Sequence, residues 1–114
     1  MTLIKLANTI FPNEDFTCNE AINIDSNKKY DFVISHSVFQ YFKNLDYAKE
    51  VIKNMINKSN KKIGIFDIND KSKKIDYHKI RMNGMNILEY KEKYKGLEHM
   101  FYEKSWFKEI AKKF

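Results

Sequence analysis

Residues 30–42 read Tyr-Asp-Phe-Val-Ile-Ser-His-Ser-Val-Phe-Gln-Tyr-Phe, and they decide the fold class of this 114-residue chain. The compact apolar run at 32–34 predicts a central parallel strand over Tyr30–Ser35 that is covered on both faces. A helix is expected at about Asp46–Asn57, because its apolar residues recur with the helical period of 3.6. Lys61–Ile68 predicts a second buried strand. Together they predict a right-handed parallel crossover in an α/β fold.

Shorter elements are expected on both sides of this unit. Leu3–Ile10 has a helical apolar stripe that stops before Pro12, and Phe16–Cys18 is a candidate short strand. After Asp70 the pattern predicts two helices, Ile75–Met85 and Asn86–Tyr94, separated by glycine. A last amphipathic helix is expected to begin at a Ser105 cap, with these residues on one side: Phe107, Ile110, Ala111 and Phe114.

The composition predicts one small globular domain in the cytoplasm. The chain is 43% hydrophobic and 32% charged, and no apolar run approaches the roughly 20 residues of a membrane-spanning helix. The N-terminus has no signal-peptide pattern. Cys18 is the only cysteine, which excludes an internal disulfide and favours a reducing compartment.

The net charge of +6 does not by itself predict a nucleic-acid binder. All but one of the 21 basic residues are lysines, whereas base and phosphate reading usually draws on arginine. His78 and the single arginine, Arg81, lie three residues apart on a predicted helix and are expected on its surface. We therefore expect these lysines to form a solvated surface, and we do not expect nucleic acid to be a partner.

The order of these segments resembles the second half of class I S-adenosylmethionine-dependent methyltransferases. The resemblance lies in residues 30–42, in Ala-Lys-Glu-Val-Ile at 48–52, and in Lys-Lys-Ile-Gly-Ile-Phe-Asp-Ile-Asn-Asp at 61–70. Residues 3–21 also look like the family's second helix and third strand. The resemblance implies an incomplete Rossmann-like domain over residues 1–114 that binds S-adenosylmethionine and methylates a small-molecule acceptor.

The family's glycine-rich cofactor loop has no counterpart here, because the sequence has no Gly-x-Gly. The first two strands, which in the family lie between the third and fourth, are also expected to be missing, as is the final strand pair. The strand at Tyr30–Ser35 would then expose an unpaired edge, so we expect self-association or pairing with a complementing fragment. We also expect the chain to be inactive alone. The alternative is a non-catalytic partner module derived from this fold.

The resemblance assigns cofactor contacts to two segments. Glu20 and Ala21 stand where the family contacts the adenine, although the family more often has aspartate, and Glu20 is equally compatible with a solvated loop. Ser35 and His36 follow a buried strand at its carboxyl end, where open α/β sheets bind ligands. His36 is also a candidate general base, since imidazole titrates near neutrality, or a packing histidine.

Acceptor contacts are expected at the same rim and in the segment after it. The candidates are Tyr41, Asp67, Asn69 and Tyr102, with His99 as a second catalytic candidate. Asp67 and Asn69 are also compatible with loop capping. The sequence has no metal-ligand spacing and no Gly-x-Ser-x-Gly elbow, which argues against a metal centre and a serine hydrolase.

Overall fold

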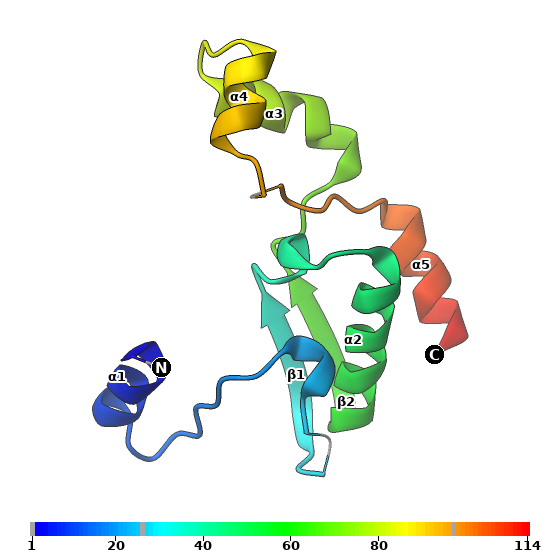
Figure 1. Cartoon of the computed structure of the whole chain (residues 1–114). Coiled ribbons are helices and arrows are strands. Elements are labelled where there is room, and N and C mark those ends of the chain that lie inside the picture. The colour runs from blue at the N-terminus through cyan, green and yellow to red at the C-terminus, as the bar shows by residue number, and fades with distance from the viewer. Residues whose placement is uncertain (1, 26, 97) are drawn as a thin grey trace.

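A parallel β-α-β unit forms the centre of the computed structural model, which describes residues 2–25, 27–96 and 98–114 (Figure 1). Strand β1 (Tyr30–His36) pairs in parallel with β2 (Ser59–Phe66), and helix α2 (Leu45–Lys58) connects them. The register places Val33 beside Ile63 and His36 beside Phe66. The predicted mixed α/β architecture with a parallel strand pair is confirmed.

Helix α2 covers one face of the sheet. The Asn44 side chain caps it by accepting a hydrogen bond of 2.8 Å from the Tyr47 backbone N–H, a role that asparagine commonly takes at helix starts. Its buried residues recur at three- and four-residue spacing: Ala48, Val51, Ile52 and Met55. They meet Val33, Ile63 and Ile65 of the strands, and this contact forms the core.

Segments from the second half of the chain complete this core. Helix α5 (Lys104–Lys113) contributes Ile110, and Tyr102 is 1% exposed beside Phe39. The Tyr102 hydroxyl donates a hydrogen bond of 2.8 Å to the Phe39 carbonyl oxygen. The predicted start of the last helix is wrong, because Glu103 and not Ser105 occupies its N-cap position.

The second face of the sheet is open, which corrects the expectation of a strand covered on both faces. Phe32 is 62% exposed and Ile34 is 68% exposed on β1. On β2 the ring of Phe66 folds back over Gly64, where a Cβ atom would approach it to 2.7 Å. The apolar run at 32–34 is thus suited to a two-sided environment that the described residues supply on one side only.

The N-terminal segment lies apart from the sheet (Figure 1). Helix α1 (Thr2–Ile10) forms as predicted, but Leu3, Leu6 and Ile10 on it are more than half exposed. The predicted strand at Phe16–Cys18 is wrong, since these residues are irregular and no strand formed by the described residues lies beside them to complete a backbone ladder. The radius of gyration, 17.0 Å, exceeds the roughly 13 Å of a compact domain of this size.

Helices α3 (Lys74–Met82) and α4 (Ile87–Lys93) form a hairpin beyond the carboxyl ends of the strands (Figure 1). Asn83 and Gly84 both adopt positive φ at the turn after α3, a conformation that asparagine and glycine tolerate well. Both predicted helices are therefore present, with shorter bounds. The hairpin is joined to the core by the segment that ends at Tyr102, which forms a bridge with Asp70.

Candidate functional site at the carboxyl ends of the strands

The rim of the sheet carries two residues in unusual backbone conformations. Ser37 directly follows β1 with φ of 59°, and Asp67 directly follows β2 with φ of 57°. Non-glycine residues rarely adopt this left-handed region, and such positions cluster at functional sites. A hydrogen bond of 3.1 Å from the Ser37 backbone N–H to the Phe66 carbonyl oxygen continues the ladder and holds the two loops together.

The hydrogen bonds at this rim indicate which ring nitrogen of neutral His36 carries the proton. The Ser37 hydroxyl donates to the Asp67 carboxylate, and the Ser37 Oγ lies 2.9 Å from His36 Nδ1. Because the hydroxyl has one proton and directs it to Asp67, Oγ accepts from His36 Nδ1–H. In neutral His36 the Nε2 atom therefore carries the lone pair. This is the protonation state that a general base requires.

A second feature brings one predicted cofactor residue and one predicted acceptor residue together. Glu20 and Tyr41 line one hollow of about 290 Å³, which we call the Glu20 hollow. The other lining residues are Phe42, Lys43 and Tyr47. The Tyr47 hydroxyl donates to Glu20 Oε2 at 3.4 Å, and the Asn54 side chain donates to the Ile22 carbonyl oxygen at 2.7 Å. This second bond fastens the short 3-10 turn Ala21–Asn23 to α2.

Two polar atoms next to the rim are buried without a partner. They are Ser35 Oγ and Gln40 Oε1, and no other described side chain has such an atom. Buried polar atoms are nearly always hydrogen-bonded, so an orphan indicates a place for a water or a ligand. Ala21, the other predicted cofactor residue, is half-buried and packs against the core.

The predicted acceptor residues Asn69 and Tyr102 have structural contacts. The Asn69 carbonyl oxygen accepts from the Tyr102 backbone N–H at 2.9 Å, and its amide donates to the Met100 carbonyl oxygen at 3.5 Å. Tyr102 is fully buried, and its hydroxyl already donates to Phe39. The position of Tyr102 in the core corrects its assignment to the acceptor site, because the hydroxyl faces the protein interior.

His99 reaches the site through its contacts with Tyr41 and the α3–α4 hairpin. Its ring meets the Tyr41 ring edge-on with 5.1 Å between centroids, and its Nδ1 lies 2.8 Å from the Tyr77 hydroxyl. Burial, followed by the Arg81 charge, lowers the pKa of His99. Burial, followed by the Lys74 and Arg81 charges, also lowers the pKa of His78.

The lowered pKa values of these two histidines predict that the hairpin loses stability in acid. The unfolded chain, whose histidines have a pKa near 6.5, binds protons more readily than the folded hairpin. Stability is therefore expected to fall as the pH drops through about 6.5 towards the lowered values. NMR titration of the imidazole signals should give pKa values below 6.5 for both residues. Values at or above 6.5 would contradict the burial described here.

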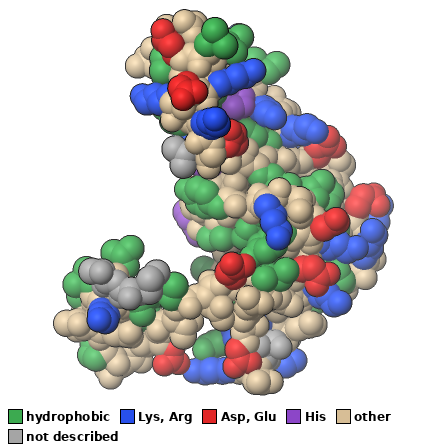
Figure 2. Space-filling model, in the orientation of Figure 1, with side chains coloured by type: hydrophobic (Ala, Val, Ile, Leu, Met, Phe, Trp, Pro, Cys, Tyr) green, Lys and Arg blue, Asp and Glu red, His purple; other side chains and the backbone are tan. Residues whose placement is uncertain are grey.

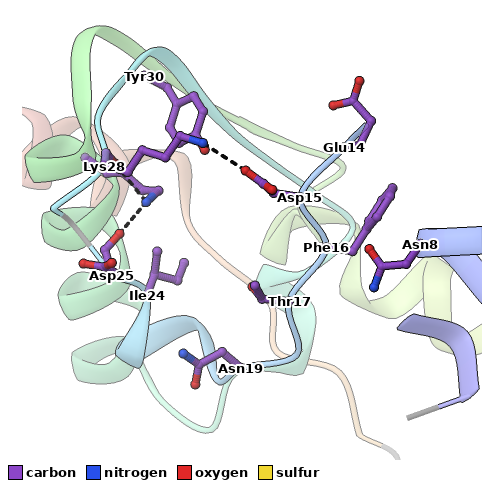
Figure 3. Close-up of a pocket in the computed structure, with 11 residues that line it drawn as sticks. Asn8, Glu14, Asp15, Phe16, Thr17, Asn19, Ile24, Asp25, Lys28 and Tyr30 are labelled. Atoms are coloured by element: carbon purple, nitrogen blue, oxygen red, sulfur yellow. Dashed lines mark hydrogen bonds and ion pairs between the residues drawn. The ribbon is translucent and has the colours of Figure 1, made fainter. Parts of the chain in front are cut away.

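A cavity in the N-terminal region lies away from this rim. It measures about 530 Å³ between the segment after α1 and the start of β1, and its walls include Asn8, Phe16 and Tyr30 (Figure 3). An ion pair of 2.9 Å between Lys28 and Asp15 crosses this region. The cavity is near the amino end of β1, away from the rim that carries His36.

Comparisons with known proteins identify no relative. No protein-family model, no curated protein and no solved structure matches the chain. Among the described residues, no group of three or more histidines, cysteines, aspartates or glutamates is placed to hold a metal ion. None of the described helices is long and apolar enough to cross a membrane.

Sequence reasoning missed two parts of the site. Ser37 links His36 to Asp67, but its role depends on a backbone conformation that its residue type does not announce. Arg81 and His78 are half-buried in the hairpin, although we expected them on the surface. The sequence did carry one signal that singles out Arg81, because it is the one arginine among 21 basic residues.

Proposed function

We propose that this chain is the second half of a class I S-adenosylmethionine-dependent methyltransferase domain, acts on a small-molecule acceptor, and is inactive alone. The observation that supports this most is the Glu20 hollow. It joins a residue expected to contact the cofactor with Tyr41, expected to contact the acceptor, although the two are far apart in sequence. The rim carries His36, whose neutral ring has its lone pair on Nε2.

The residues of the hollow fit one end of the cofactor. An adenine ring is flat and aromatic and carries an amino group that donates hydrogen bonds. Aromatic walls from Tyr41, Phe42 and Tyr47 suit stacking, and the Glu20 carboxylate is an acceptor. The fit is partial, because the sequence has no glycine-rich loop to hold the rest of the molecule.

The chemistry divides simply between the cofactor and the chain. S-adenosylmethionine, when bound, supplies an already activated methyl group. The chain's task is to position the acceptor, to exclude water and to accept a proton. His36 Nε2 takes the proton of an O–H or N–H acceptor, while Ser37 and Asp67 hold the imidazole in the required tautomer. Orientation alone supplies up to about 7–11 kcal/mol in the best cases.

The N-terminal region is where the proposal expects two further strands of the domain. In the resembling family, two strands separate the counterpart of residues 16–18 from the counterpart of β1. Here the two segments enclose the 530 Å³ cavity shown in Figure 3. The same strands would pair with the free edge of β1, whereas Phe32 and Ile34 on its open face require a layer packed on that face.

Titration with S-adenosylhomocysteine, followed by NMR, tests this proposal. With part of the site absent, we expect weak binding, with a Kd of about 1 mM or above, which corresponds to roughly 4 kcal/mol. The amide shifts should be confined to residues near Glu20, Ser35 and His36. Glu20→Gln should reduce the shifts, whereas Glu14→Gln, which changes another exposed acid of the same segment, should not.

Three results would each count against part of the proposal. Shifts spread over α5, or none at all with a folded chain, would remove the adenine assignment. Methyl transfer by the purified chain from S-adenosylmethionine to any acceptor would contradict the expected inactivity while supporting the enzyme class.

A non-catalytic partner module is the second candidate function. The open sheet face, with Phe32 and Ile34 exposed, favours it because a partner would cover this face whether or not chemistry takes place. The coding sequence upstream of Met1 separates the two candidates. A glycine-rich strand and loop encoded in frame would support a methyltransferase, whereas a start of translation at Met1 would support a partner module.

A further inference from the structure

The α3–α4 hairpin contains a small pocket of about 140 Å³ on the side of Glu98 and His99, which we call the Arg81 pocket. Its walls gather basic and aromatic side chains from three segments: Lys74, His78 and Arg81; Tyr90, Lys91 and Tyr94; Glu98 and His99. Elsewhere on the molecule, lysines are spread over the face seen in Figure 2. The pocket is a local concentration of positive charge.

Neighbouring tyrosines hold the Arg81 guanidinium in place. One terminal nitrogen donates a hydrogen bond of 2.7 Å to the Tyr77 hydroxyl, and the guanidinium carbon lies 4.0 Å from the centre of the Tyr94 ring. A guanidinium has five N–H donors, so most of them stay available to a ligand. An arginine whose orientation is fixed by stacking loses little freedom on binding.

The charge of the pocket is not neutralised by the residues around it. Lys74, Lys91 and Arg81 supply three positive charges, and Glu98 is the one carboxylate in the lining. Among the ion pairs between described residues, none involves any of these four side chains. An anion would therefore meet cations that have no carboxylate of a described residue within ion-pair distance.

Two histidine–tyrosine pairs add neutral hydrogen-bonding groups. His78 Nδ1 lies 2.6 Å from the Tyr90 hydroxyl, and His99 Nδ1 lies 2.8 Å from the Tyr77 hydroxyl. Each ring therefore has its Nδ1 engaged, which leaves the Nε2 for a further partner. His99 also contacts Tyr41, so the pocket is connected to the Glu20 hollow by one side chain.

We infer that the Arg81 pocket binds the carboxylate or phosphate group of a small molecule, with Arg81 as the principal contact. A planar guanidinium matches either oxyanion with two parallel hydrogen bonds. A volume of about 140 Å³ accommodates one such group. The identification of this anion with the methyl acceptor rests on the proposed function, whereas the binding itself does not.

Separate titrations with inorganic phosphate and with benzoate test the inference and distinguish the two anions. Amide and imidazole NMR signals of the hairpin should shift to saturation with at least one of them. Arg81→Gln should weaken that binding by about tenfold or more, because hydrogen bonds to charged groups are among the strong ones. Lys79→Gln removes the same charge from an exposed position of the same helix and should change the affinity less than about twofold.

Two further measurements keep the test decisive if Arg81→Gln disturbs the hairpin. Arg81→Lys retains the charge and should still lose most of the affinity, because the planar fork and the stacking are gone. In the unchanged chain, the bound anion should raise the pKa of both His78 and His99, because a nearby negative charge favours the protonated ring. The other charged and phenolic side chains that face these two rings are Lys74, Lys91, Arg81, Glu98, Tyr77, Tyr90 and Tyr94.

The inference is overturned if neither anion saturates the signals, if R81Q and K79Q bind equally well, or if the two imidazole pKa values do not move. Tighter binding of a DNA or RNA duplex with a steep salt dependence would also overturn it, in favour of a backbone-binding surface. The anion titrations contain no cofactor and report on the hairpin signals. The S-adenosylhomocysteine titration is a separate experiment that reports on the amide signals near Glu20 and His36. The inference and the proposed function can therefore fail independently.

Discussion

Replacing Phe39 by alanine is expected to lower the free energy of unfolding by about 3–5 kcal/mol, a large part of the roughly 5–15 kcal/mol of a small domain. Phe39 is 1% exposed, and its ring centre lies 4.7 Å from that of Phe42 and 6.0 Å from that of Tyr102. Its removal leaves a cavity where the 3-10 turn Phe39–Tyr41 meets the segment before α5. Urea denaturation followed by circular dichroism measures the change.

Tyr41→Ala is the matched control for this prediction. It removes another aromatic ring from the same turn, but Tyr41 is 67% exposed, and we expect a loss of less than about 1 kcal/mol. Equal losses for the two variants would mean that the turn does not pack against the core as described. Tyr102→Phe should cost about 1 kcal/mol, because the Phe39 carbonyl keeps its second donor, the Phe42 backbone N–H.

The β-α-β unit was predictable because its signals are local. The helical period of Ala48, Val51 and Met55 specifies the buried side of α2, and Asn44 caps it through a contact three residues away. The apolar run at 32–34 needs no distant partner to be recognised as a strand. These patterns depend on backbone geometry that is the same wherever a helix or a strand occurs.

Predictions that depended on distant residues were less successful. A strand at Phe16–Cys18 requires a neighbour to bond with, and the described residues provide none. The burial of Tyr102 depends on Phe39, 63 positions away. Residue types alone could not decide whether its phenol faces solvent or the core, because tyrosine suits both.

The candidate site shows the same division. Strand ends and the resemblance indicated Glu20, His36 and Asp67, and the structure adds how the last two are connected. Ser37 could not be assigned to this link in advance, since its position depends on a left-handed backbone after β1. The grouping of Arg81 with two histidines results from the packing of α4 and of the later segment with His99 against α3, which no local pattern specifies.

Self-association of the purified chain is the second large effect that we expect. The open face of the sheet exposes Phe32 and Ile34, and the β1 edge opposite β2 has no strand beside it among the described residues. Water-exposed apolar side chains and unpaired backbone groups both favour pairing with another chain. In a pure preparation that chain is another copy. Light scattering should give at least twice the 13.7 kDa of one chain.

Two double variants separate this interface from general stickiness. Phe32→Lys with Ile34→Lys places two charges on the open sheet face and should return the mass to that of one chain. Ile75→Lys with Ile80→Lys changes two apolar residues of α3 that are even more exposed, at 73% and 81%, and should leave the association intact. A monodisperse monomer of the unchanged chain, with the amides of Phe32–Ile34 exchanging freely, would refute the prediction. It would also mean that the exposed face of β1 is tolerated in water without any covering chain.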